Sequence, residues 1–433
     1  LNYFSDLGVD EAGCTGYPDR TGAFVTAKAC KVRGAYSRQA FANQEAKIVS
    51  AINALGADVV ALEEIENPVA VGVGSDRDAA LARLVTALNE ALGSDVWAYV
   101  PSPPTIPAGE DVIRVAFIYK PAAVTPVGDS VIHDDAAFSG LARQPLAQEF
   151  VRRTTERASA PSFVVIANHF KSKGSVPVGA GDGNTDSGDG QGNANAIRVA
   201  QASSLASFAA RYADKPTLLV GDFNSYSQED PIKTIEGAGW ERVSGSGEPS
   251  YVYAGRSGSL DHVFANAAAT PLVAGVTSWA VNAQESIAFE YSRAGMNAHL
   301  AVEAEDPYRS SDHNPEIIGL RLLEGAPTPG DEPVPAVTPG PETGTTPTPA
   351  TSPAPAGPRP HSATTSAPRV TTRAATASSR GKRPENRASP ASARALARTG
   401  ASAELAIGAG FLLALAGLAA RGAACRRLGA PQR

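Results

Sequence analysis

The first 344 residues of this chain are short of positive charge. They carry 25 Lys and Arg against 42 Asp and Glu, a net charge of −17, whereas residues 345–433 carry +11. Tight sequence-specific binding of nucleic acid relies on basic side chains that neutralise phosphates. The acidic composition therefore argues against that class of protein. It is compatible with an enzyme that recruits divalent cations, and equally with an acidic surface that keeps an exported protein soluble.

Large apolar side chains are almost absent from about residue 325 to 395, where Pro, Thr, Ala and Ser dominate. Such a segment cannot bury enough surface to offset its conformational entropy, so we predict that it is disordered. We expect three parts: a globular body over 1–323, a linker over 324–395 and a C-terminal signal over 396–433. A body of that length is ample for a sizeable core.

Cysteine is scarce, with three in the whole chain. Cys14 and Cys30 lie 16 residues apart in the predicted body, and Cys425 lies near the C-terminus. In an exported domain this spacing favours one disulfide that closes a short loop. Two free thiols are the alternative.

The chain also lacks a long hydrophobic run. Residues 405–420 are mostly apolar, but a stretch of that length is marginal for a permanent membrane span. It follows Leu396-Ala397-Arg398-Thr399-Gly400 and precedes Arg421, and this order resembles a Gram-positive cell-wall sorting signal of the actinobacterial Leu-Ala-x-Thr-Gly form. The resemblance implies that a sortase cuts between Thr399 and Gly400 and joins Thr399 to peptidoglycan.

On this interpretation residues 405–420 meet the membrane only transiently, and the mature protein is secreted and anchored to the cell wall. An ordinary C-terminal anchor helix is the alternative, and the trailing arginines suit it as well. No signal peptide is visible, and Leu1-Asn2-Tyr3-Phe4 reads like the end of a strand. We therefore expect the sequence to be a fragment of a longer precursor.

Several predicted strands are each followed at once by polar side chains. Taken singly, a glutamate or histidine at a strand end is more often a solvated or structural residue. Together, these residues are the inventory for metal-assisted attack of water on a phosphate ester, because a hard cation such as Mg²⁺ takes one or two carboxylates plus phosphate oxygens. The segments are 58–62 before Glu64, 163–167 before His169, 217–220 before Asp222 and Asn224, Leu260-Asp261-His262, and Ser311-Asp312-His313 before 317–322.

Eight segments, in order, resemble the endonuclease/exonuclease/phosphatase superfamily and, within it, bacterial extracellular nucleases. They span most of the predicted body. They are Gln44-x-x-Lys47-Ile48-Val49, Leu62-Glu63-Glu64-Ile65-Glu66-Asn67, Asn168-His169-Phe170-Lys171-Ser172-Lys173-Gly174, Gly188-Asp189-Gly190-Gln191-Gly192-Asn193, Arg198-Val199-Ala200-Gln201-Ala202, Gly221-Asp222-Phe223-Asn224, Ser259-Leu260-Asp261-His262-Val263 and Ser311-Asp312-His313-Asn314-Pro315.

The resemblance implies an α+β fold, a two-layer β-sandwich flanked by helices. It assigns the main Mg²⁺ contact to Glu64, with Asp312 close to the same metal; Mn²⁺ and Ca²⁺ are left open. His313 would be the general base or would orient the attacking water, and Asp261 would hold its tautomer. The family's first strand carries a metal-binding Asn just upstream of Leu1, so the first strand is expected to be missing in part.

Further roles follow from the same resemblance. His169 would hydrogen-bond a phosphate oxygen or help the leaving group, while Asp222 and Asn224 would position water, metal or phosphate. Tyr119 is a candidate for the phosphate pocket. The stretch 174–195 is rich in Gly and Asp, and it is interpreted as a mobile loop or as a Ca²⁺-binding loop.

The expected activity is hydrolysis of phosphodiester bonds in extracellular DNA, with RNA as a second polymer. Two alternatives stay open. One is a surface phosphatase or phospholipase of the same superfamily, and the other is an inactive surface adhesin, which would show no metal-dependent activity.

Overall fold

The computed structural model describes residues 1–9, 14–153, 162–245, 249–292 and 305–322. The predicted linker and sorting signal, with Thr399, Gly400 and residues 405–420, lie outside the described residues. Within the described ranges, no helix has the length and apolar character needed to cross a bilayer.

Strands dominate the described body, and helices lie between them. The helices are α1 (Arg38–Ala54), α2 (Pro68–Val71), α3 (Ala79–Leu92), α4 (Asn195–Ala209) and α5 (Asp230–Gly237). The strands are β1 (Thr15–Pro18), β2 (Phe24–Lys28), β3 (Val59–Glu66), β4 (Ala98–Tyr99), β5 (Ile113–Tyr119), β6 (Val124–Ile132), β7 (Arg143–Arg152), β8 (Ser162–His169), β9 (Thr217–Asp222), β10 (Glu241–Arg242), β11 (Tyr251–Tyr253), β12 (Arg256–Gly258), β13 (Asp261–Ala265), β14 (Val273–Ser278) and β15 (Glu316–Leu320).

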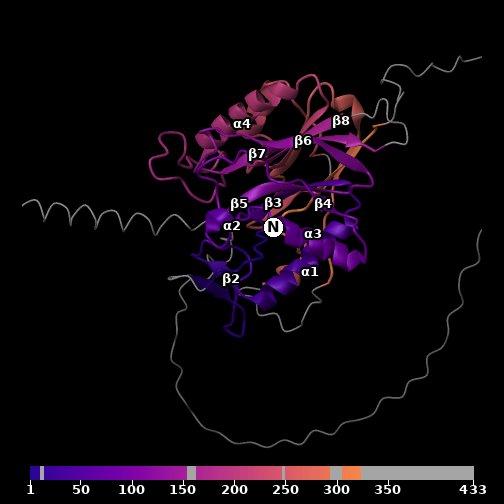
Figure 1. The fold of residues 1–433 in the computed structure, drawn as a ribbon. Helices are drawn as coiled ribbons and strands as arrows, with labels where there is room; N and C mark the ends of the chain where they lie inside the picture. Colours follow the sequence, from indigo (N-terminus) through magenta and orange to yellow (C-terminus); the bar gives the residue numbers. More distant parts are fainter. Residues whose placement is uncertain (10–13, 154–161, 246–248, 293–304, 323–433) are drawn as a thin grey trace, which may run out of the picture. The chain divides into compact units, whose positions relative to one another are not determined.

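Two sheets face each other at the centre of the body (Figure 1). One has the order β3-β5-β4 and the other β10-β13-β9-β8-β7-β6. Only β8 and β9 run parallel in the larger sheet; its other pairs are antiparallel. Apolar side chains from both inner faces, including Phe117 of β5 and Phe150 of β7, form one buried cluster between the sheets.

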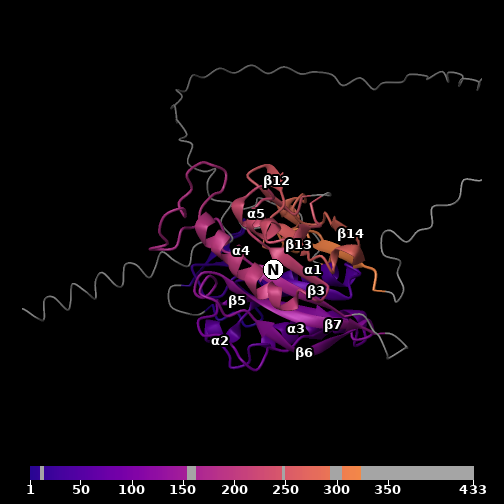
Figure 2. The same cartoon turned by 90° about the horizontal axis from the view of Figure 1, so that it is seen from above.

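Helices cover the outer faces of both sheets. The cluster beyond the smaller sheet joins it to α1 and α3, and the cluster beyond the larger sheet joins it to α4 and α5. Figure 1 shows α4 on one side of the strands and α1 and α3 on the other, and Figure 2 shows α4 beside α5. The expected two-layer sandwich with flanking helices is confirmed.

The N-terminal residues lie along β3. Tyr3 forms a parallel bridge with Ile65, and its amide and carbonyl bond Glu64 O and Glu66 N at 3.0 Å each. Tyr3 and Phe4 are fully buried. Tyr3 therefore adds a single bridge at the β3 edge of the smaller sheet, and residues 1–4 form no strand of their own.

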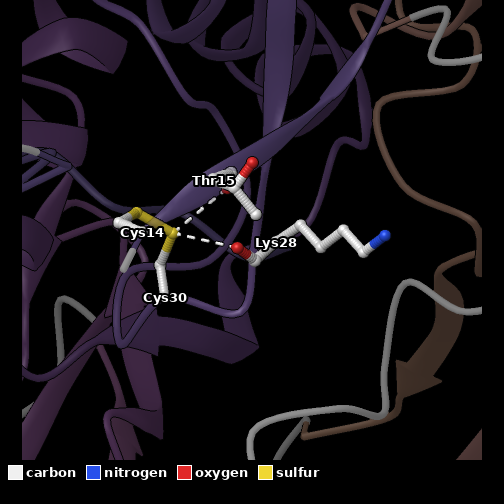
Figure 3. The surroundings of a disulfide bond; sticks show 4 residues. All are labelled: Cys14, Thr15, Lys28 and Cys30. Atoms are coloured by element: carbon white, nitrogen blue, oxygen red, sulfur yellow. Dashed lines mark hydrogen bonds between the residues drawn. A yellow bond between two sulfur atoms is a disulfide. The ribbon is translucent and has the colours of Figure 1, made fainter. Parts of the chain in front are cut away.

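A disulfide joins Cys14 to Cys30 beside β1 and β2 (Figure 3). The carbonyl oxygens of Thr15 and Lys28 each lie 3.3 Å from the Cys30 sulfur. The bond closes the loop that carries this two-stranded sheet.

A buried guanidinium organises the Gly- and Asp-rich loop that was interpreted as mobile or calcium-binding. Arg198 of α4 is fully buried; its Nη1 donates to Asn193 O at 2.6 Å and its Nη2 to Gln191 O at 2.8 Å. Gln191 in turn accepts from the Asp230 amide at 3.0 Å. These bonds tie the end of the loop to both α4 and α5, so that part of the loop is built into the fold.

Gly221 allows β8 and β9 to end side by side. Its φ is +128°, and a Cβ there would stand 2.1 Å from Asn168 O and 2.7 Å from Glu63 Oε1. The first of these atoms is backbone and cannot swing away. The position therefore requires glycine for conformation and for space.

We expect Gly221→Ala to destabilise the fold by more than about 1–3 kcal/mol, the cost of backbone strain alone, because the clash adds to it. Gly56→Ala is the matched control, since Gly56 has φ +74° but nothing within 4 Å of its Cβ position. Urea denaturation of the three proteins checks this. Equal losses in the two variants would show that the close approach to Asn168 contributes nothing.

Candidate active site

Three neighbouring strands bring polar side chains together at one end of the larger sheet. β8 ends at His169 and β9 at Asp222, and these two residues are register partners. β13 is antiparallel to β9, so its first residue, Asp261, also lies opposite Asp222. The Nε2 atom of His169 is 3.5 Å from Asp222 Oδ2. The sheet register thus gathers one histidine and two carboxylates.

His313 completes the cluster from outside the sheet. Its Nδ1 atom lies 2.7 Å from Asp261 Oδ2, and Ser250 Oγ donates to the same oxygen at 2.6 Å. Among the described residues no hydrogen bond engages the other ring nitrogen, Nε2. The Asp261 contact therefore fixes the orientation of the ring and leaves Nε2 for a substrate.

Asn224 is held beside Asp222 in a left-handed backbone conformation, with φ +47°. Its amide N–H donates to Asp222 Oδ1 at 2.6 Å, and its Nδ2 donates to Asp222 Oδ2 at 2.9 Å and to Phe170 O at 3.1 Å. The acid and amide that were predicted to act together are therefore one hydrogen-bonded unit.

A bulge in β3 turns two successive glutamates toward this cluster. The pairing of β3 with β5 shifts between Leu62 and Ile65, and Glu64 has φ +60°. Glu63 Oε1 accepts from the Asp222 amide at 2.8 Å, across the sandwich. Glu64 Oε2 accepts from the N-terminal ammonium of Leu1 at 3.0 Å. In a regular strand these two side chains would point to opposite faces.

Arg143 adds a buried cation. It begins β7 opposite His169, and its Nη2 donates to Phe170 O at 3.0 Å. Its Nε has no hydrogen-bond partner, although the side chain is buried. Burial lowers the pKa of Arg143, while the carboxylates of Asp111 and Glu64 raise it.

The charged groups around Glu64 and His169 set the protonation states of these two side chains. Burial raises the pKa of Glu64, but nearby positive charge, including that of the Arg143 guanidinium, outweighs burial, so this pKa is lowered and the carboxylate is ionised. Burial and the positive charge of Arg143 lower the pKa of His169 well below its usual value. His169 is therefore neutral at pH 7.

Carboxylates crowd the other side of the cluster. Burial raises the pKa of Glu63, and Asp261 and Asp222 raise it further. Burial also raises the pKa of Asp222, against the opposing effect of His313. Burial lowers the pKa of His313, yet Asp261 and Asp312 raise it by more. The cluster holds more acidic groups than it can keep ionised together.

Such a donor set fits a divalent cation. Within the described residues, no three His, Cys, Asp or Glu side chains converge as a ready ligand group. Mg²⁺, however, usually takes one or two protein carboxylates and completes its shell with water and phosphate oxygens. Glu64 is ionised, and the positive charge of the Arg143 guanidinium acts on its carboxylate. A cation would also relieve the repulsion among the neighbouring carboxylates.

The structure gathers most of the predicted site residues, but not all. Glu64, His169, Asp222, Asn224, Asp261 and His313 form the cluster. Asp312 precedes His313 and is exposed. Tyr119 is elsewhere: it pairs with Val59 at the far end of β5 and packs on Phe150, about 16 Å along β3 from Glu64. Its ring belongs to the core between the sheets.

Two residues of the cluster were missed. Glu63 is adjacent to Glu64, and a regular alternation would place it on the other face; only the bulge reverses this. Arg143 lies in no recognisable motif, and it reaches the site because β7 pairs with β8. The one sequence signal for Arg143 is that a charged residue stands at the start of the segment that forms β7.

Comparisons with known proteins identify the family to which the chain is similar. A model of the endonuclease/exonuclease/phosphatase family matches residues 32–313. Similar solved structures include a functionally unknown conserved protein from Enterococcus faecalis V583 (12% identity, 66% of this chain and 92% of that chain, TM-score 0.41) and a family protein from Bacteroides thetaiotaomicron (12%, 64% and 89%, 0.40). Another is D. rerio TDP2 complexed with single strand DNA product (14%, 65% and 92%, 0.39). No curated protein matches the chain.

We expect Glu63→Gln to leave stability nearly unchanged, because the amide oxygen can still accept from the Asp222 N–H. Glu63→Ala should destabilise by about 1–3 kcal/mol, because that N–H loses its partner. Urea denaturation at pH 7 measures both. A large loss in the glutamine variant would contradict the assigned hydrogen bond and would point to a need for the charge.

Proposed function

Because this chain belongs to the endonuclease/exonuclease/phosphatase family, we propose that it is a nuclease that hydrolyses phosphodiester bonds of DNA, with RNA as a second substrate. The family comprises hydrolases of phosphoester bonds. The finer assignment rests on the chemistry that the clustered side chains can perform.

The observation that carries the proposal is the His313–Asp261 contact of 2.7 Å beside the His169–Asp222 contact of 3.5 Å. Hydrolysis of a phosphodiester requires a base for the attacking water and a polar group at the phosphate. Asp261 holds His313 by Nδ1, so neutral Nε2 accepts the proton of water. Asp261 and Asp312 raise the pKa of His313 well above its usual value and favour the protonated ring; a bound cation would offset their charge and favour the neutral ring that accepts a proton.

The phosphate side of the reaction falls to His169 and Arg143. A neutral His169 donates a hydrogen bond to a non-bridging phosphate oxygen, and the Arg143 guanidinium balances the charge that the phosphate brings. Asp222 and Asn224 orient water and phosphate from the floor of the site. Groups held rigidly in this way meet the developing charge without rearrangement.

A divalent cation would be held by Glu64, with Asp312 as the second carboxylate. When bound, it supplies neutralisation of the phosphate charge. Mg²⁺ suits one or two carboxylates best, and Mn²⁺ has similar requirements.

Nicking of supercoiled plasmid tests the proposal. The wild-type chain should convert the plasmid to relaxed circles with Mg²⁺ and should not do so with EDTA. His313→Ala should lower the rate by at least about 10²-fold, because the base is lost. His133→Ala is the matched control, since His133 stacks on Phe208 and bonds Ser204 of α4, outside the cluster.

Circular dichroism and melting confirm that each variant is folded. A folded wild-type protein that cuts no plasmid in Mg²⁺ or Mn²⁺ would overturn the nuclease proposal. Hydrolysis of phosphate monoesters or sphingomyelin by the same sample would then indicate the phosphatase or phospholipase alternative.

We also propose that the protein is secreted and anchored to a Gram-positive cell wall. The support is the sequence order of Leu396-Ala397-Arg398-Thr399-Gly400, the apolar residues 405–420 and the trailing arginines. A sortase would join Thr399 to peptidoglycan, and the linker would carry the body outward.

Thr399→Val should abolish wall attachment. In a host with a sortase, the wild-type protein should be released only by digestion of the wall, whereas the variant should be found in the membrane or medium. Thr372→Val in the linker is the control and should behave as the wild type. Immunoblots of the fractions measure this, and unchanged wall attachment of the Thr399 variant would refute the signal.

A further inference from the structure

An aromatic hairpin flanks the catalytic histidine. β11 and β12 pair as a two-stranded sheet, and Tyr251 of β11 forms an isolated bridge with His313. The Tyr251 and His313 rings lie 4.5 Å apart between centroids. Tyr251 is half-buried and supports the imidazole from one side. This contact alone has a structural purpose, because it helps to hold His313 in place.

Tyr253 extends this aromatic surface away from His313. Its ring is nearly parallel to that of Tyr251, with centroids 6.4 Å apart and an interplanar angle of 11°. The side chain is 49% exposed. Tyr253 therefore does not contribute to a core, and it lies two residues beyond Tyr251, the residue that forms the bridge to His313. Its exposed ring needs another explanation.

A third tyrosine lies in the same region. Tyr226, which follows the Asp222–Asn224 unit, packs against β12: a Cβ at Gly258 would stand only 2.6 Å from its Cε1. Lys173 Nζ lies 4.6 Å from the Tyr226 ring centroid.

The net charge makes such a surface useful. Residues 1–344 carry −17, so general attraction to a polyanion is weak. Stacking of bases on aromatic rings is not electrostatic in this sense, and it tolerates every base because every base has a π face. Aromatic rings beside the site can therefore retain a nucleic acid that the overall charge repels.

We infer that Tyr251 and Tyr253, called here the tyrosine ladder, stack the unpaired nucleobases next to the phosphate that is cut at His313. Tyr226 borders the same surface. The inference rests on the proposed nuclease function and narrows its substrate to strands that present unstacked bases at the site. Tyr253 is the specificity-determining residue, and Tyr251 links it to the catalytic centre.

Binding in EDTA tests the ladder without turnover. Fluorescence anisotropy of the full chain is measured with labelled hexathymidylate and with the same backbone carrying abasic sites. The wild type should bind the base-bearing strand about tenfold more tightly than the abasic strand. Tyr253→Leu should lose this preference, and Tyr253→Phe should keep it, because the ring and not the hydroxyl is needed.

Phe24→Leu is the matched control, since Phe24 is 42% exposed on β2 and packs on Tyr36 instead of the ladder. It should bind both strands as the wild type does. Equal binding of the two strands by the wild type would overturn the inference, as would an undiminished preference in Tyr253→Leu. A general loss of affinity for both strands in that variant would also overturn it, because the effect would then be structural.

The outcome is separable from that of the nuclease proposal. Preferential binding of the base-bearing strand without cleavage in Mg²⁺ would support the ladder and refute the nuclease. Plasmid cleavage by a protein that binds both strands equally would support the nuclease and refute the ladder.

Discussion

The register among β8, β9 and β13 is the constraint on which the site depends. It sets His169 and Asp261 on either side of Asp222, so three reactive groups are fixed by backbone hydrogen bonds instead of by flexible loops. A shift of one residue in either pairing would turn a side chain to the opposite face. Gly221 permits this register because no Cβ fits between β9 and Asn168 O. The pairing of the strands therefore fixes the relative positions of His169, Asp222 and Asp261.

Electrostatic repulsion is the cost of this arrangement. Burial and mutual proximity raise the pKa values of Glu63 and Asp222, while Asp261 is kept ionised by its contact with His313. The Asp222 amide partly compensates by donating to Glu63, which also joins the two sheets. A cluster of this kind is unfavourable in isolation, and a bound divalent cation would relieve the repulsion among its carboxylates.

The family resemblance implied the two-layer fold, and apolar runs located several strands whose polar end residues the structure brings together. His169 and Asp222 were found in this way. Glu63 was not, because a bulge breaks the alternation that assigns residues to faces. Arg143 depends on a pairing between strands that local sequence does not encode. Tyr119 was expected in the phosphate pocket from the family resemblance. The pairing of β3 with β5 is antiparallel, however, so the end of β5 lies beside the start of β3 and far from Glu64.

The hairpin beside the polar cluster is positioned differently from the cluster itself. Of the clustered groups, His169, Asp222 and Asp261 lie at strand ends, where the backbone leaves little freedom, whereas Tyr253 projects from a short hairpin and is half exposed. Such a hairpin can vary in sequence without disturbing the register of the larger sheet. The bridge between Tyr251 and His313 and the packing of Tyr226 against Gly258 hold the hairpin in place. If Tyr253 contacts the substrate as proposed, a substitution there would change that contact without changing the strand register that positions His169, Asp222 and Asp261.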